Sequence, residues 1–381
     1  MSSLLLLAGL AVAVFVGFNI GGSNTGVAFG PAVGSGAVSK VGAAGLMSLS
    51  FLLGGWTLGR RVVDTLSRGL VAGDPFTMPV TIAVLLFIGL ALFGGNVFGV
   101  PASTSMTAVG AIVGLGLAVG RLRVDAVLEI VGWWLVAPVV GFWVSAVVGR
   151  YWYAALVARI AIDRSDGPLV TLDRSGSIPR PTLGENTTRR EFGGTLLVVA
   201  IGCYMAFSAG ASNVANAVAP LIGNGALTMN QGILLAAGAA ALGAFTIARR
   251  TLDTVGNDLT DLPLVAALIV AVVSASIVSV LSALKIPASF VVIATMSVVG
   301  LGWGRATVAD SVPDTPRVPA SSVGVPVESA DAPVAADGSP AAAELYQPAT
   351  TARVVVLQNL VPAIATLVAY VVFRYVPIVG L

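Results

Sequence analysis

The same short blocks occur twice in this chain, in the same order, about half a chain length apart. Residues 21–31 read GGSNTGVAFGP and residues 210–220 read GASNVANAVAP, so both copies follow the pattern Gly-x-Ser-Asn-x-x-x-Ala and end in proline. We call these two segments the signature segments. The block TLGRRVVDT at 57–65 recurs at the same spacing as TIARRTLDT at 246–254. Repeated blocks in one order predict an internal duplication with two related halves.

The composition places both halves in a membrane. Hydrophobic residues make up 56% of the chain and charged residues only 10%, with a mean hydropathy of +0.95. Soluble domains carry about 25% charged residues. The chain is therefore predicted to be a polytopic integral membrane protein. Its net charge of +2 is too small to suggest nucleic-acid binding.

Apolar runs of about 20 residues, the length that spans a bilayer as a helix, occur in equal number in the two halves. The runs are 3–20, 41–59, 79–98, 101–120, 125–149, 192–209, 230–248, 262–284, 287–304 and 353–376. Segments 21–38 and 210–228 are rich in Gly, Ser and Asn and are expected to be broken or re-entrant helices. An odd number of spans in each half inverts the second half relative to the first. The predicted fold is an all-α integral membrane protein with about ten spanning helices and two broken or re-entrant segments in two inverted-topology repeats.

The chain divides into five expected regions. These are a first transmembrane repeat at 1–149, a central loop at 150–191, a second repeat at 192–304, a disordered insertion at 305–351 and a last transmembrane helix at 352–381. The larger share of the 20 basic residues lies on the side of the central loop. Basic residues favour the cytoplasmic side. We therefore expect a multi-pass plasma-membrane protein with a cytoplasmic central loop and both termini outside.

The polar residues of the signature segments are the first candidates for a binding site. Ser23, Asn24, Ser212 and Asn213 are predicted to contact a substrate, and Asn24, Asn213 and Asn216 to contact a cation. Broken helices expose N–H groups that attract anions and C=O groups that attract cations. The alternative interpretation is that small residues only allow tight helix packing.

A second pair of segments supplies further candidates. VPAS at 100–103 recurs as IPAS at 286–289, and proline commonly begins a helix. Ser103, Thr104, Ser105 and Ser289 then lie in or before a first helical turn, where hydroxyl and free N–H groups can hold an oxyanion. Ordinary helix capping is the alternative. The second copy continues with Phe290 and Val291, so the polar lining is predicted to be asymmetric.

Several chemistries are disfavoured. The chain has no histidine, and its 18 acidic residues lie in loops or near span ends. An enzyme, a proton pump with a central carboxylate, a cofactor and any metal beyond sodium are therefore not expected. The repeated Arg60-Arg61…Asp64-Thr65 block is interpreted as a charge cluster at a span end, and a gating or anion-attracting role is the alternative.

The signature segments resemble those of the inorganic phosphate transporter (PiT) family, which carries a GANDVANA-type signature in each inverted half. GGSNTGVA at 21–28 and GASNVANA at 210–217 match it, and PASTSM at 101–106 is similar to the family's PVSTTH-type motif. The resemblance implies a secondary transporter that takes up phosphate with sodium or protons; some relatives carry sulfate. It also implies termini outside and a cytoplasmic central loop.

The chain departs from this pattern at the charged positions. Ser23-Asn24 and Ser212-Asn213 stand where the family has Asn-Asp, and Ser105-Met106 stands where it has Thr-His. Loss of two carboxylates should weaken cation binding and reduce repulsion of a dianion. Altered cation coupling is therefore the hypothesis for this chain.

The sequence thus favours a secondary transporter of inorganic phosphate that works by alternating access and is coupled to sodium or protons. Sulfate or another tetrahedral oxyanion is the alternative substrate. A non-transporting sensor on the same scaffold is the alternative of another class. Expected partners are the oxyanion, the coupling cation and membrane lipid, and the existence of a homodimer stays open.

Overall fold

The computed structural model describes residues 3–98, 103–160, 170–173, 180–183, 187–246, 263–309, 348–376 and 378. The first half comprises α1 (Ser3–Gly34), α2 (Lys40–Gly54), η1 (Gly55–Gly59), α3 (Arg60–Asp64), η2 (Thr65–Gly69), α4 (Met78–Phe98), α5 (Thr104–Ala118) and α6 (Val124–Tyr151). The connection carries α7 (Tyr153–Ile160), β1 (Val170–Asp173) and β2 (Arg180–Leu183). The second half comprises α8 (Arg189–Gly223), α9 (Met229–Thr246), α11 (Leu264–Ala283), α12 (Phe290–Ala309) and α13 (Pro348–Tyr375).

The membrane part is helical, as the sequence predicts. Among the described residues, eight helices are long and apolar enough to cross a bilayer, and two shorter apolar helices accompany them. α2, η1, α3 and η2 run on as one helix of 30 residues with two π-helical turns. The described part of the central loop adds what the sequence did not predict: the short helix α7, and the antiparallel pair β1–β2 with Val170 opposite Leu183.

α4 and α5 form a hairpin. Its ends are tied together, because Ala72 N donates to Arg121 O at 2.9 Å and Arg123 N donates to Leu70 O at 2.8 Å. The hairpin therefore begins and ends on the same side of the bundle. α5 has only 15 residues, which at 1.5 Å per residue gives about 23 Å, less than the hydrocarbon core of about 30 Å.

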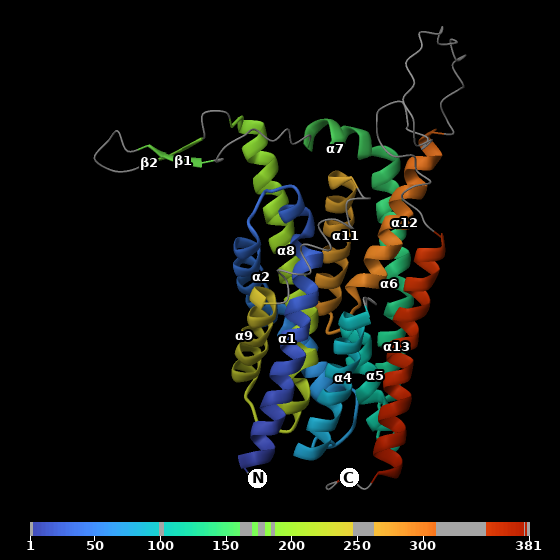
Figure 1. Cartoon of the computed structure of the whole chain (residues 1–381). Coiled ribbons are helices and arrows are strands. Elements are labelled where there is room, and N and C mark those ends of the chain that lie inside the picture. Colours follow the sequence, from blue (N-terminus) through green and yellow to red (C-terminus); the bar gives the residue numbers. More distant parts are fainter. Residues whose placement is uncertain are drawn as a thin grey trace.

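α11 and α12 form the corresponding hairpin at the opposite end of the bundle (Figure 1). The chain begins at the end where α4 and α5 lie, and α7 lies at the other end (Figure 1). α1 and α8, which carry the two signature segments, run in opposite directions (Figure 1). This arrangement supports the proposal of two inverted repeats, and it brings the start of α5 and the segment between α11 and α12 toward the middle of the molecule (Figure 1).

The prediction of broken helices at 21–38 and 210–228 is wrong. α1 continues to Gly34 and α8 to Gly223, so both signature segments lie inside unbroken helices. The polar side chains stay compatible with the helix because they bond to carbonyls one turn back. Thr25 Oγ1, for example, donates to Gly21 O at 2.7 Å. Such back-bonding satisfies a hydroxyl without breaking the helix.

The first glycine of each signature segment serves close helix packing. A Cβ on Gly21 would overlap Ala240 O of α9, and a Cβ on Gly210 would overlap Phe51 O of α2. Gly210 lies 189 positions after Gly21, and Ala240 lies 189 positions after Phe51. The two contacts are thus equivalent under the internal repeat, and the tight-packing interpretation holds for these glycines.

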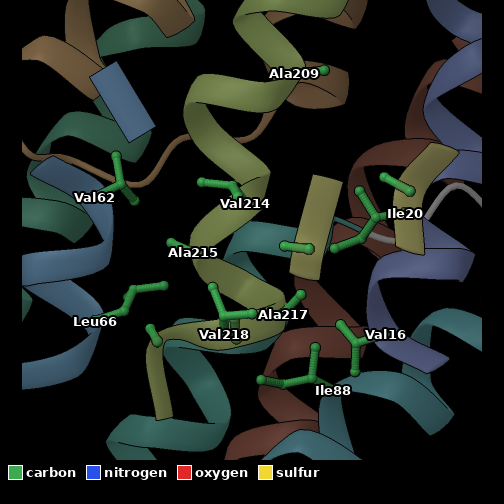
Figure 2. Close-up of a cluster of buried hydrophobic side chains, with 14 of the residues drawn as sticks. Val16, Ile20, Val62, Leu66, Ile88, Ala209, Val214, Ala215, Ala217 and Val218 are labelled. Carbon is green, nitrogen blue, oxygen red and sulfur yellow. The ribbon is translucent and has the colours of Figure 1, made fainter. Parts of the chain in front are cut away.

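The second signature segment runs through the core of the protein. Every residue of α8 from Ser208 to Ile222 is buried. Figure 2 shows Val214 and Val218 of α8 between Leu66 of η2 on one side and Val16 and Ile20 of α1 on the other. Small apolar residues on α8 let these helices approach closely, which fixes the position of the polar residues on the same helix.

Two sequence expectations fall outside the described residues. The second copy of the arginine block at 246–254 is described only at its first residue, Thr246. Most of the expected insertion at 305–351 is likewise outside, although α12 extends to Ala309 and α13 begins at Pro348. The expected domain boundaries therefore remain a proposal.

Candidate functional site

Three elements meet at the polar face of α8. The beginning of α5 reaches it from one hairpin, and the segment 283–289 between α11 and α12, which we call the tip loop, reaches it from the other. The α8 residues involved are Ser212, Asn213 and Asn216. The contacts place residues from both halves of the chain in one cluster, as the sequence predicted for the second signature segment.

Asn213 is the centre of the cluster. Its Oδ1 accepts hydrogen bonds from Thr104 Oγ1 at 2.8 Å, from Ser105 Oγ at 3.4 Å and from Asn216 Nδ2 at 3.1 Å. Only 4% of Asn213 is exposed. Three neutral donors on one oxygen indicate a position that can also stabilise a partial or full negative charge.

Ser212 connects the cluster to the tip loop. Its hydroxyl lies 3.1 Å from Ser105 Oγ and donates to Ala288 O at 2.9 Å. The first half thus contributes hydroxyls, whereas the tip loop contributes a backbone carbonyl. This agrees with the asymmetry predicted from Phe290 and Val291.

Ser103 and Ser289 are buried beside the cluster but cap their own helices. Ser103 Oγ accepts from Met106 N at 3.3 Å, and Ser289 Oγ accepts from Val292 N at 3.4 Å. In this conformation, both serines therefore behave as ordinary helix caps. Their position at the helix starts still places them next to Thr104 and Ala288.

Asn216 carries a buried acceptor without a partner. Its Nδ2 donates to Ser105 Oγ at 3.3 Å, but its Oδ1 has no hydrogen bond among the described residues. A buried acceptor of this kind calls for a ligand or water. Asn216 is fully buried and Ser212 is 1% exposed, whereas Thr104 at the edge of the cluster is partly exposed.

The structure does not bring Ser23 and Asn24 into this cluster. Ser23 Oγ donates to Asn19 O at 3.0 Å and Asn24 Nδ2 donates to Ile20 O at 2.8 Å, both within α1. Both residues are partly exposed, in contrast to Ser212 and Asn213. The two signature segments therefore differ in environment although their sequences correspond.

Sequence reasoning missed the residues that hold the tip loop from outside the cluster. Arg61 Nη1 donates to Ala283 O and Thr65 Oγ1 to Lys285 O, each at 2.7 Å, and Trp134 Nε1 donates to Pro287 O at 2.8 Å. The repetition of the block that contains Arg61 and Thr65 was a sequence signal that could have identified them. What the block contacts could not be known from the sequence.

The cluster can bind ions of either sign through neutral groups. Its hydroxyl and amide hydrogens can donate to an oxyanion, and its amide and carbonyl oxygens can coordinate a hard cation. The described residues hold no group of three His, Cys, Asp or Glu side chains that could bind a metal ion.

Comparison with known proteins identifies the family of this chain. The model of the phosphate transporter family matches residues 20–330. A solved structure titled "The sodium-dependent phosphate transporter" superposes with a TM-score of 0.66 at 17% identity, covering 98% of this chain and 100% of that one. At this identity the likeness shows the fold alone.

Two curated relatives differ in substrate. The sulfate permease CysP of Bacillus subtilis is 30% identical over 300 residues, which is 78% of this chain and 77% of the permease. A sodium-dependent phosphate transporter of Toxoplasma gondii is 32% identical over 130 residues, which is 32% of this chain and 15% of that protein. With the family model covering most of its length, this chain belongs to the phosphate transporter family.

Proposed function

We propose that this protein is a secondary transporter that moves inorganic phosphate across the membrane by alternating access, coupled to sodium or protons. The single observation that carries the proposal is the buried polar cluster where α8 meets the start of α5 and the tip loop. The family and the fold are those of transporters. A buried, neutral, hydrogen-bonding cluster between repeats is where such proteins bind substrate.

The arrangement of the hairpins suggests how access alternates. The α4–α5 hairpin starts from one end of the bundle and the α11–α12 hairpin from the other (Figure 1). Movement of one hairpin tip away from α8 opens the cluster to one side, and movement of the other opens it to the opposite side. We place the end with α7 in the cytoplasm because of its basic residues, and the protein in the plasma membrane.

Substrate and cation are assigned to overlapping parts of the cluster. Thr104, Ser105 and Ser212 supply hydroxyls to the oxyanion, with Ser103 and Ser289 beside them. Asn213 and Asn216 supply amide oxygens to the cation, and the unpartnered Oδ1 of Asn216 supports this role. Ser23 and Asn24 remain candidates only for a conformation in which they leave their bonds to α1.

Sulfate is the second candidate substrate, and two observations favour it. The relative matched over 77% of its length is a sulfate permease. The cluster contains no carboxylate, and a carboxylate could accept the proton of monohydrogen phosphate, which sulfate lacks. A neutral cluster therefore discriminates poorly between the two dianions.

Transport assays in proteoliposomes test the proposal. Radiolabelled phosphate is expected to accumulate under an imposed sodium or proton gradient, and the gradient that drives uptake identifies the coupling ion. Competition with unlabelled sulfate then ranks the two substrates. If labelled sulfate accumulates and phosphate neither accumulates nor competes, the substrate is sulfate. Absence of flux of either anion would contradict transport and favour a sensor.

Replacement of Thr104 by valine is expected to raise the KM for the oxyanion about fivefold, because a typical hydrogen bond contributes about 1 kcal/mol. The change removes the hydroxyl that donates to Asn213 Oδ1 and keeps the shape of the side chain. Thr107→Val is the matched control, since Thr107 Oγ1 bonds only to Ser103 O on its own helix. Equal KM values for the two variants would remove Thr104 from the site.

A further inference from the structure

The tip loop is held by side chains from three different helices. Arg61 and Thr65 hold the carbonyls of Ala283 and Lys285, at the end of the hairpin that faces η2. Trp134 of α6 donates to the carbonyl of Pro287, and Ser212 of α8 donates to the carbonyl of Ala288. The first two contacts lie outside the polar cluster, yet they fix the loop that reaches it.

The backbone of the tip loop needs such support. Lys285 has φ 68°, in the left-handed region, and is the one non-glycine residue with positive φ among those described. Positive φ elsewhere is found at glycines 36, 73, 120 and 225. Lys285 N donates to Ser282 O and Ile286 N to Leu281 O, the pattern of a helix C-terminus that normally uses glycine. A lysine there is strained, so it persists because surrounding contacts hold it.

Arg60 and Asp64, which belong to the same repeated block at 57–65, do not hold the tip loop. Arg60 stacks on Trp56 at 4.5 Å and bonds to Asn230 Oδ1 at 2.6 Å. Asp64 is exposed. In the described part of the chain, Arg61 and Thr65 are the residues of this block that donate hydrogen bonds to the tip loop.

We propose that Arg61 and Thr65, which we call the tip latch, are positioning residues that hold the α11–α12 hairpin tip against the substrate cluster. This inference rests on the proposed function and deepens it. The latch stabilises the binding-competent arrangement and must release when that hairpin opens. Neither residue contacts the substrate. Loss of the latch lowers the population of the competent conformation, which weakens apparent affinity without removing any substrate contact.

Transport kinetics provide the first test. Arg61→Ala and Thr65→Val are expected to raise the oxyanion KM about tenfold, since apparent affinity scales with the competent fraction, while the maximal rate is kept or raised. Thr65→Ser, which keeps the hydroxyl, should restore the wild-type KM. Arg60→Ala and Thr57→Val are matched controls, because Arg60 bonds elsewhere and Thr57 Oγ1 bonds only within its own helix. A lower maximal rate at unchanged KM in Arg61→Ala and Thr65→Val would contradict the proposed role of the tip latch.

Spectroscopy provides a second test that does not depend on transport. A nitroxide attached at Leu284→Cys, in a Cys203→Ser background, reports the mobility of the tip loop; Leu284 is 51% exposed and makes no latch contact. The label is expected to be immobilised with the latch intact and mobile in Arg61→Ala and Thr65→Val. Equal mobility in latch and control variants overturns the proposal. If the label is mobile only in the latch variants but the protein transports no oxyanion, the latch is supported and the transport function is rejected.

Discussion

Alanine at Gly21 or at Gly210 is expected to prevent stable assembly of the helix bundle. At both positions the added methyl group would overlap a backbone carbonyl of the neighbouring helix, Ala240 O in one case and Phe51 O in the other. A backbone atom cannot rotate away as a side chain can, so whole helices must separate. Overpacking of this kind costs about 3 kcal/mol, and here it lies within the signature segments.

The measurement is thermal stability in detergent, followed by fluorescence-detected size-exclusion chromatography. Gly45→Ala in α2 and Gly238→Ala in α9 are matched controls on the partner helices, because a methyl group at either position meets nothing within 4 Å. The controls should be neutral or gain about 0.5–1 kcal/mol, since alanine favours the helix more than glycine. If Gly21→Ala and Gly210→Ala had the same melting temperature as the controls, the helix pairs α1–α9 and α8–α2 could not be packed as closely as described.

These glycines also show how far the sequence could predict the fold. Hydropathy was enough to predict a membrane protein, and the offset of 189 residues between the repeated motifs relates even the individual contacts of Gly21 and Gly210. The local structure of the segments that contain these glycines was predicted wrongly, as broken or re-entrant helices. Glycine, serine and asparagine favour helix breaks in isolation, but here tight packing and back-bonding to the previous turn keep α1 and α8 continuous.

The candidate site was predictable in part for a similar reason. The signature residues of α8 and the hydroxyls of α5 could be named from the sequence, because polar residues in a membrane segment are costly without a function. Their partners could not. The carbonyl of Ala288 and the contacts of Arg61 depend on which hairpin lies against which helix, and that is a property of the tertiary packing.

The second large effect is expected at Asn213. Asn213→Asp introduces a carboxylate at a position where the family's signature has aspartate, with almost no change in shape. Thr104 Oγ1, Ser105 Oγ and Asn216 Nδ2 already donate to Asn213 Oδ1, so a carboxylate would keep all three hydrogen bonds. Such charge-assisted bonds stabilise a buried anion. The variant is therefore expected to fold and to change the ion dependence of transport.

The change in ion dependence follows from the added charge. A carboxylate a few ångströms from a bound dianion costs several kcal/mol at an effective dielectric constant of about 20. Without sodium, the oxyanion KM of Asn213→Asp is thus expected to rise about a hundredfold, which corresponds to about 2.7 kcal/mol. Sodium bound at the carboxylate offsets the repulsion, so saturating sodium should bring KM back toward that of the wild type. The measurement is oxyanion uptake in proteoliposomes over a range of sodium concentrations.

Asn24→Asp is the informative comparison, because the sequence treats residues 24 and 213 as equivalent and the structure does not. Asn24 Nδ2 donates to Ile20 O, and a carboxylate cannot replace that donor. Asn24 is also partly exposed, so a charge there is screened by solvent. Its effect on KM should be about threefold or less, in line with the weak interaction of exposed charges. Equal sodium dependence in the two variants would mean that both signature segments contribute to one site in the transporting protein, and that α1 must release Asn24 to do so.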